Sequence, residues 1–491
     1  MPERPNILIV LSDQHNRSFM GCAGEPIVRT PNLDRFAAEG LRFTDAYCPG
    51  PLCCPSRMSF MTSRYPSGNR VWGNSQILSS GIPTWAHALG AAGYETALLG
   101  RMHFNGSDQR HGFERRPIGE YSARHPGAPE VGGPRWTKFS SASSGQSRAC
   151  VEVNGHGTTA YQLFDDQVTA AACRYLHEQG RAKARRPFAA VVGWVLPHCP
   201  FICPRELFEY YAERIEAPAL SEAERAALPP SIRRFQELRG IHDPLPERTI
   251  RNARAAYYGL CEYLDRNFGL LLEALEASGL SEDTLVLYTS DHGEMAGEHG
   301  CWWKSNYYEG SAGVPLLARG PGVPQGATCE AVCNLVDLGP TCIDVGGGAP
   351  LPHAAGRSLR GFLEGRAPVN WVDETFSEFV GAKHDPPSCM IRQGRWKLWT
   401  YQGDAQPALF DLESDPAELK DLGGAPEYAE IRAKLLKRIG EVWDGEAVAR
   451  ENARAQAEVR VIEAWGRAVA PPHEDTLPVP PPEMEKDIVL L

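Results

Sequence analysis

Two stretches of the chain are almost unbroken in apolar character and lead into an aspartate. The first runs from Asn6 to Leu11 ahead of Asp13, and the second runs from Thr284 to Thr289 ahead of Asp291. Such a run, without polar alternation, is typical of a parallel strand whose two faces are both covered by helices. We therefore predict a central sheet in which polar side chains follow closely on the strands.

Helical segments alternate with further strands between these two stretches. Thr30 and Pro31 supply a cap residue and a first-turn proline for a helix that Gly40 closes. The other predicted elements are a helix from Pro83 to Gly93, strands from Glu95 to Leu99 and from Phe188 to Val195, and a long helix from Ala253 to Gly279. The alternation predicts an α/β fold over residues 1–345, with a large, mostly parallel sheet sandwiched by helices.

The pattern changes after about residue 345. Shorter strands are predicted from Asp373 to Phe379 and from Arg395 to Tyr401, followed by an amphipathic helix from Tyr428 to Trp443. We expect a smaller α+β domain over residues 346–450 and a C-terminal extension over residues 451–491. The extension is proline-rich from Pro471 to Pro482 and ends in apolar residues. Because these residues would gain from contact with a neighbour, we expect a homo-oligomer, a dimer or a tetramer.

Composition excludes several classes of partner. The 491 residues carry a formal net charge of −11, and 42% of them are hydrophobic while 23% are charged. A net negative charge disfavours nucleic acid and anionic membranes, so neither is an expected partner. The first apolar run is too short for a signal or membrane segment, so we expect a cytoplasmic protein whose 14 cysteines stay reduced.

Polar residues gather at the ends of the predicted strands. Asp13, His103, His198 and Asp291 each follow a strand candidate. In open α/β sheets, ligands bind beyond the carboxyl ends of the strands. These four residues therefore define the expected edge of an active site.

The most specific string of the chain is Cys53-Cys54-Pro55-Ser56-Arg57, followed by Thr62-Ser63-Arg64. It resembles the sulfatase signature C-x-P-S-R with its trailing T-G-R, although Ser63 replaces the glycine. The resemblance implies that a formylglycine-generating enzyme oxidises Cys53 to an aldehyde, which serves as the nucleophile once hydrated. The alternative for Cys53 is an ordinary buried thiol before a helix.

The resemblance extends to a divalent metal site. Asp13-Gln14 and Asp291-His292 resemble the metal-binding pairs of the sulfatase branch of the alkaline phosphatase superfamily, and Asn74 matches a further ligand position. Together with the converted Cys53 they imply a site for calcium, since hard oxygen ligands predominate. Manganese, favoured by the imidazole, and magnesium remain alternatives.

Cationic and protonatable residues occur in the order of the family. Arg101 and His103 resemble its G-K-x-H element, with arginine in place of lysine, while His198 and Lys304 fall where relatives bind sulfate and the ester oxygen. The resemblance implies that Arg101, His198 and Lys304 contact substrate and that His198 or Lys304 protonates the leaving alcohol. His103 would take the proton that releases sulfate, and Arg57 would hold the nucleophile and the metal ligands.

The likeness covers nearly the whole chain and is nearest to choline-sulfatase-like enzymes, but it leaves the substrate open. Trp136, Phe139 and Glu152 would suit choline, whereas Lys383 and His384 would suit an anionic or sugar sulfate. The expected substrate is thus a small-molecule sulfate ester of choline, aryl or carbohydrate type. Two alternatives are hydrolysis of a phosphonate monoester or phosphodiester, and a degenerate sulfate-binding protein without activity.

Overall fold

The computed structural model describes residues 4–120, 125–128, 146–182, 186–381, 385–471 and 486–491. In this part of the chain an eight-stranded sheet has the order β11-β2-β10-β9-β1-β7-β4-β5. Its strands are β1 (Asn6–Asp13), β2 (Leu41–Phe43), β4 (Glu95–Gly100), β5 (Arg115–Ile118), β7 (Phe188–Pro197), β9 (Thr284–Ser290), β10 (Leu316–Arg319) and β11 (Ala327–Cys329). Strand β10 runs antiparallel to both of its neighbours, while the other pairs are parallel. The predicted mostly parallel α/β sheet is confirmed.

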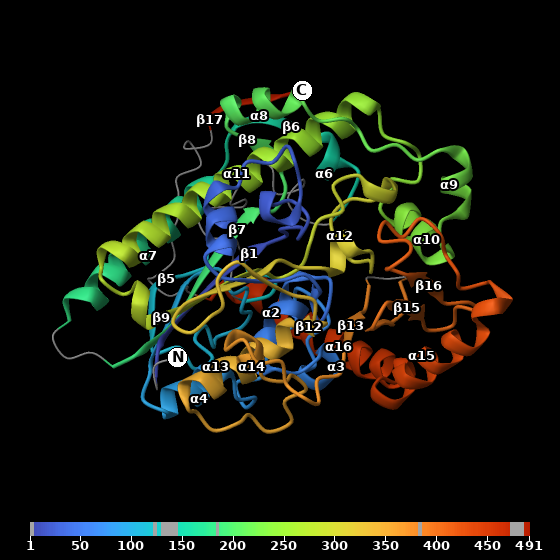
Figure 1. Ribbon diagram of the computed structural model, residues 1–491. Helices are drawn as coiled ribbons and strands as arrows, with labels where there is room; N and C mark the ends of the chain where they lie inside the picture. The colour runs from blue at the N-terminus through green and yellow to red at the C-terminus, as the bar shows by residue number, and fades with distance from the viewer. Residues whose placement is uncertain (1–3, 121–124, 129–145, 183–185, 382–384, 472–485) are drawn as a thin grey trace.

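Helices cover both faces of this sheet, as its apolar central strands require. The long helices α7 (Ala160–Arg181) and α11 (Glu247–Ala277) pack together on one face with α1 (Pro31–Ala38) and α8 (Arg205–Ala212). The opposite face carries α2 (Cys53–Thr62), α4 (Trp85–Ala91) and α13 (Leu338–Gly346) (Figure 1). All eight residues of β1 are buried, so its continuous apolar run reflects cover on two sides.

Two helix boundaries differ from the sequence prediction for local reasons. Helix α4 begins at Trp85, two residues later than expected, because the side chain of Thr84 accepts a hydrogen bond from the backbone N–H of His87. Helix α11 begins at Glu247, six residues earlier than expected, directly after Pro246. The remaining short helices are α3 (Pro66–Asn69), α6 (Ala149–Glu152), α9 (Glu222–Ala227), α10 (Pro230–Leu238), α12 (Glu309–Ala312) and α14 (Arg360–Leu363).

The C-terminal region forms a separate four-stranded antiparallel sheet, β13 (Glu374–Phe379), β14 (Ser388–Gln393), β15 (Trp396–Tyr401) and β16 (Ala408–Asp411). Helix α15 (Ala429–Val442) packs on it around a small apolar core that includes Leu398 and Leu435. The expected smaller α+β unit is therefore present. Residues 345 and 450, the predicted domain boundaries, lie inside α13 and α16 (Gly445–Val469), so the division into domains stays a prediction.

The end of the chain pairs with a strand from the first half of the sequence. Strand β17 (Lys486–Leu490) pairs antiparallel with β6 (Asn154–Thr158), which pairs in turn with β8 (Phe201–Cys203). Figure 1 shows β17 beside β6 and β8, across the molecule from α15. The apolar end thus finds a partner strand in its own chain, and the oligomeric state stays a prediction. The short strands β3 (Ala46–Tyr47) and β12 (Cys333–Asn334) form a further pair.

Each of the 14 cysteines is free, and most are buried. The reducing compartment expected from the sequence stays a prediction. Among the helices of the described residues, none combines the length and the apolar character needed to cross a membrane.

Candidate active site

Strand register brings the two sequence-distant aspartates together. Strands β1 and β9 are parallel neighbours in which Ser12 pairs with Ser290. Asp13 and Asp291 are the next residues, and the backbone N–H of Asp291 donates to the carbonyl of Ser12 at 3.2 Å. Both carboxylates are fully buried at the carboxyl edge of the sheet.

Helix α2 delivers Cys53 to the same point. Cys53 is the first residue of this helix, and its Sγ lies 3.2 Å from Nε2 of His292 and 3.8 Å from Oδ1 of Asp13. A helix N-terminus presents free backbone N–H groups and a partial positive charge. The position therefore suits a group that becomes anionic during reaction.

Four ligand atoms, one each from Asp13, Cys53, Asp291 and His292, lie within 4.8 Å of one another and are all buried. Nδ1 of His292 lies 3.0 Å from the carbonyl oxygen of Gly293 and donates to it, which leaves Nε2 with its lone pair facing the carboxylates. Two carboxylates and a correctly oriented imidazole form a donor set that fits a divalent cation.

Two arginines bind the outer oxygens of these carboxylates. Arg57 donates to Oδ2 of Asp291 at 2.7 Å and to Oδ2 of Asp13 at 3.1 Å, while Arg101 donates to Oδ2 of Asp13 at 2.7 Å. Burial alone would raise the pKa of Asp13, but Arg101 and Arg57 outweigh burial and hold this pKa well below its usual value. Both carboxylates are thus oriented with Oδ1 toward Cys53 and His292.

Lys304 and His198 meet beside the nucleophile. Nζ of Lys304 lies 2.9 Å from Nε2 of His198 and also donates to Oε1 of Gln14. Nδ1 of His198 lies 2.6 Å from the carbonyl oxygen of Cys199, so Nδ1 carries the proton and Nε2 accepts from Lys304. Burial and the Lys304 charge lower the pKa of His198. A hydrogen bond with Cys53 partly offsets this lowering.

His103 is held close to Arg101, after β4. Its Nδ1 lies 3.0 Å from a terminal nitrogen of Arg101, and its backbone N–H donates to Glu120 at 2.8 Å. Burial and the Arg101 cation lower the pKa of His103 well below its usual value. The imidazole is therefore neutral, with Nδ1 accepting from Arg101 and the proton on Nε2.

The two amide side chains proposed as metal ligands also have partners within the protein. Oε1 of Gln14 accepts from Lys304, and Oδ1 of Asn74 accepts from the backbone N–H of Cys54 at 3.0 Å. Asn74 is exposed, whereas Gln14 is buried and has a positive φ of 70°. An amide oxygen has two lone pairs, so these contacts leave one for a cation.

Sequence reasoning missed two buried glutamates that support the site. Glu294 accepts from the backbone N–H groups of Ala296 and Trp303 and from the amide of Gln14. Glu120 accepts from the backbone of Met102 and His103. The only signal was the position of Glu294 three residues after Asp291, because Glu120 belongs to no local motif.

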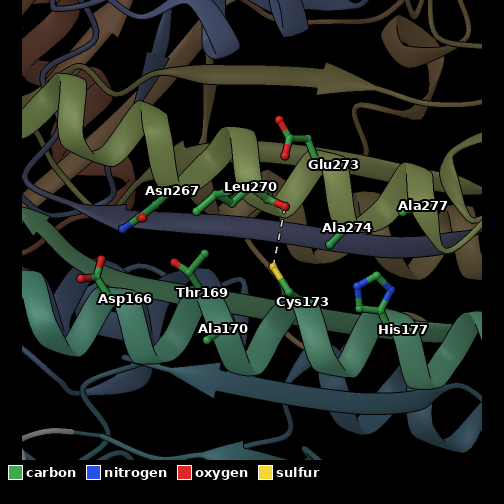
Figure 2. A pocket seen from close by; sticks show the side chains of 10 residues that line it. All are labelled: Asp166, Thr169, Ala170, Cys173, His177, Asn267, Leu270, Glu273, Ala274 and Ala277. Carbon is green, nitrogen blue, oxygen red and sulfur yellow. Dashed lines mark hydrogen bonds between the residues drawn. The ribbon is translucent and has the colours of Figure 1, made fainter.

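A cavity of about 420 Å³ is lined by Asn74 and by Leu52 and Ser305, the chain neighbours of Cys53 and Lys304. A different cavity of about 440 Å³ lies between α7 and α11 (Figure 2), where Cys173 donates to the carbonyl of Leu270. None of the residues lining that second cavity belongs to the predicted site. The first cavity is therefore the candidate substrate cleft.

Four residues considered for substrate binding, Trp136, Phe139, Lys383 and His384, lie outside the described residues. Glu152 is described, and its side chain accepts from Arg148 at 2.7 Å.

Comparison with known proteins places the chain in a family. Residues 5–348 match the sulfatase family, and residues 297–444 match the C-terminal part of N-sulphoglucosamine sulphohydrolase. Choline-sulfatase of Rhizobium meliloti (strain 1021) is 34% identical, with 90% of this chain and 88% of the relative covered. Arylsulfatase K of Bos taurus is 29% identical, with 89% and 81% covered.

Among solved structures, phosphonate monoester hydrolase of Agrobacterium radiobacter is similar with a TM-score of 0.73 and 25% identity, covering 91% of this chain and 96% of that one. The family match spans more than half of the chain, and the choline-sulfatase likeness spans nearly all of it. The chain therefore belongs to the sulfatase family and is a sulfuric ester hydrolase.

Proposed function

We propose that this sulfatase cleaves a small-molecule sulfate monoester by means of Cys53 in its formylglycine form and a bound divalent metal, with calcium as the first choice. The observation that carries the proposal is the convergence of Cys53 Sγ, His292 Nε2 and the Oδ1 atoms of Asp13 and Asp291 in one buried cluster. A thiol with only a structural role would have no need of two buried carboxylates beside it.

Asp13, Asp291 and His292 would hold the metal, with Gln14 and Asn74 as further oxygen donors. When bound, the metal would lower the pKa of an oxygen at position 53 and offset charge on the sulfuryl group. Manganese and magnesium are the alternatives to calcium. Arg57 orients both carboxylates, and Arg101 together with Arg57 lowers the pKa of Asp13.

The aldehyde at position 53, made by a separate formylglycine-generating enzyme, would supply two hydroxyl groups on one carbon when hydrated. One hydroxyl can displace the alcohol from sulfur, and the other can expel sulfate as the aldehyde forms again. His103 would accept the proton released in the second step, which requires its Nδ1 to exchange the hydrogen bond from Arg101 for that proton.

Lys304 is the better candidate for protonating the leaving alcohol. Its ammonium group has three N–H donors, of which Gln14 and His198 accept two. The third remains for the ester oxygen. His198, with Nδ1 fixed on the carbonyl of Cys199, would orient the ammonium group and contact the substrate.

The alcohol of the ester would be of choline, aryl or carbohydrate type. The oligomeric state and a cytoplasmic location remain our expectations, and the net charge of −11 supports a partner list without nucleic acid.

Sulfate release from 4-nitrophenyl sulfate, measured with protein made together with a formylglycine-generating enzyme, tests the proposal. Wild type should release sulfate and Cys53→Ala should not. Cys173→Ser on α7 should be as active as wild type, because Cys173 lines the separate cavity between α7 and α11 (Figure 2). Phenyl phosphonate esters serve as the competing substrates, prompted by the likeness to the Agrobacterium enzyme. Faster cleavage of the phosphonate ester would favour that alternative, and no cleavage of either would favour a binding protein.

A further inference from the structure

We propose that Glu294 is a positioning residue for the proton donor of the reaction. Its carboxylate orients the amide of Gln14, and this amide in turn orients the ammonium group of Lys304. The inference rests on the proposed sulfatase reaction, in which Lys304 protonates the leaving alcohol. Glu294 acts through these two side chains and not on the reacting atoms.

Both oxygens of the Glu294 carboxylate are bound inside the protein. Oε1 accepts from the backbone N–H of Ala296 at 2.8 Å and from that of Trp303 at 2.6 Å, while Oε2 accepts from Nε2 of Gln14. The Glu294 and Gln14 side chains are fully buried, and only 3% of Lys304 is exposed. Buried polar groups must find their partners in one another, so donors and acceptors have to match along the whole chain of contacts.

The two ends of this chain of hydrogen bonds fix its direction. Lys304 has only N–H donors, so the Gln14 atom that it contacts is the amide oxygen Oε1. The amide nitrogen of Gln14 then faces Glu294, whose carboxylate accepts from it. The opposite orientation of the amide would place its NH2 group against the ammonium group and its oxygen against the carboxylate.

Glu294 also holds the main chain that carries Lys304. Ala296 and Trp303 have positive φ values of 47° and 62°, which bulky side chains rarely adopt. Oε1 of Glu294 binds the N–H groups of both residues, and Trp303 directly precedes Lys304. The carboxylate thus fixes the start of the Lys304 side chain as well as the amide that its Nζ contacts.

The position of the ammonium group depends on this amide. Among the described residues, Nζ of Lys304 has two acceptors, Oε1 of Gln14 and Nε2 of His198. A turn of the Gln14 amide would replace one acceptor by a donor, and Nζ would move from its place beside His198. The proton would then no longer be directed to the ester oxygen.

The variant Glu294→Gln reverses the direction of the chain without a change in size. Its amide oxygen keeps the N–H groups of Ala296 and Trp303, because an NH2 group cannot accept from them. Its NH2 group then faces Gln14. The Gln14 amide has to turn its oxygen toward position 294 and its own NH2 group toward Lys304.

Two aryl sulfates of similar size, 4-methoxyphenyl sulfate and 4-nitrophenyl sulfate, measure the effect in protein with formylglycine at position 53 and saturating calcium. Glu294→Gln should lower kcat by about 10- to 100-fold for the first and by about threefold for the second, because 4-nitrophenolate leaves readily without a proton. Glu298→Gln is the matched control and should change neither value. Glu298 lies on the same loop, pairs with Arg254 and has 45% of its side chain exposed.

A second change should restore the chain of hydrogen bonds. In the Glu294→Gln background, Gln14→Glu places a carboxylate at position 14 that accepts from the amide at position 294 and from Lys304, with the net charge of wild type. This double variant should regain about tenfold or more in kcat for 4-methoxyphenyl sulfate. Gln14→Glu alone sets two carboxylates against each other and should lower kcat.

Denaturant unfolding of the metal-free proteins gives a readout apart from catalysis. The unfolding midpoint should be lower in each single variant than in wild type, and higher in the double variant than in either single variant.

A double variant that is less active and less stable than both single variants would contradict the proposed chain of hydrogen bonds. Equal losses on the two substrates in Glu294→Gln would show that Glu294 does not act through protonation of the alcohol, and would leave the sulfatase reaction intact. Hydrolysis of neither sulfate by wild type would refute the proposed function and, with it, the role of Glu294 in the reaction.

Discussion

Nζ of Lys304 donates to Nε2 of His198 at 2.9 Å, and the imidazole is fixed in turn by the carbonyl of Cys199. The two candidate proton donors therefore act as one unit, with the proton on lysine. Since a general acid matters most when the leaving alcohol is a poor leaving group, this arrangement can be tested with a substrate series.

Lys304→Ala should lower kcat for an alkyl sulfate by about 10²- to 10⁴-fold and for 4-nitrophenyl sulfate by much less. The slope of log kcat against leaving-group pKa, measured with a series of aryl sulfates, should become steeper. Lys437→Ala, an exposed change on α15, is the control. Parallel losses across the series would show that Lys304 binds sulfate without protonating the alcohol.

Arg57 should be essential for the metal site and for stability. Its guanidinium is fully buried and binds both Asp13 and Asp291, so Arg57→Ala leaves two buried carboxylates with less compensation. We expect a loss of about 3 to 5 kcal/mol in the free energy of unfolding of the metal-free protein. Added calcium should recover part of this loss, because a cation replaces the missing charge.

Denaturant unfolding with and without calcium measures both effects. Arg70→Ala is the comparison, because Arg70 pairs with Glu451 at the surface and should contribute at most about 1 kcal/mol. An Arg57→Ala protein as stable as wild type would show that the two carboxylates do not depend on this cation.

Glu378 should make stability fall as the pH rises. Burial raises the pKa of this carboxyl in the folded protein to about 7 from the usual 4.5, against the opposing hydrogen bonds from Ser67. The folded state therefore binds the proton more tightly, so its contribution is fully present below pH 4.5 and is lost as the pH rises through 7.

Glu378→Gln should flatten the fall in unfolding free energy between pH 5 and pH 8, by up to about 3 kcal/mol. Denaturant unfolding at several pH values measures this, with Glu446→Gln on the exposed face of α16 as the control. An unchanged pH profile in Glu378→Gln would mean that the folded pKa of Glu378 is close to 4.5.

The C-terminal strand should stabilise the sheet beside His198. Leu490 pairs with Gly155 of β6, and a Cβ on Gly155 would lie 2.0 Å from the carbonyl oxygen of Val489. Gly155→Ala should thus lower the free energy of unfolding by more in the full chain than in a chain ending at residue 485. A double-mutant cycle of unfolding free energies measures the coupling, which we expect to be about 1 to 3 kcal/mol. Additive effects would mean that β17 is not seated on Gly155 in solution.

The parts of the fold that depend on local sequence pattern could be predicted from the sequence. The apolar runs of β1 and β9 located the sheet, and the string from Cys53 to Arg57 located the nucleophile on the first turn of α2. Some contacts between distant segments could not be predicted, because no local sequence pattern marks them. Glu120 binds backbone N–H groups, which any carboxylate at that place could do, and the pairing of β17 with β6 joins segments more than 300 residues apart.

Peptide mass spectrometry of the segment containing Cys53, on protein that releases sulfate from its substrate, tests the central claim most directly. Conversion of the thiol to an aldehyde lowers the peptide mass by about 18 Da, and the fraction converted should match the fraction of active sites. An active protein whose Cys53 remains entirely a thiol would contradict the account, because the nucleophile would then have to be something else.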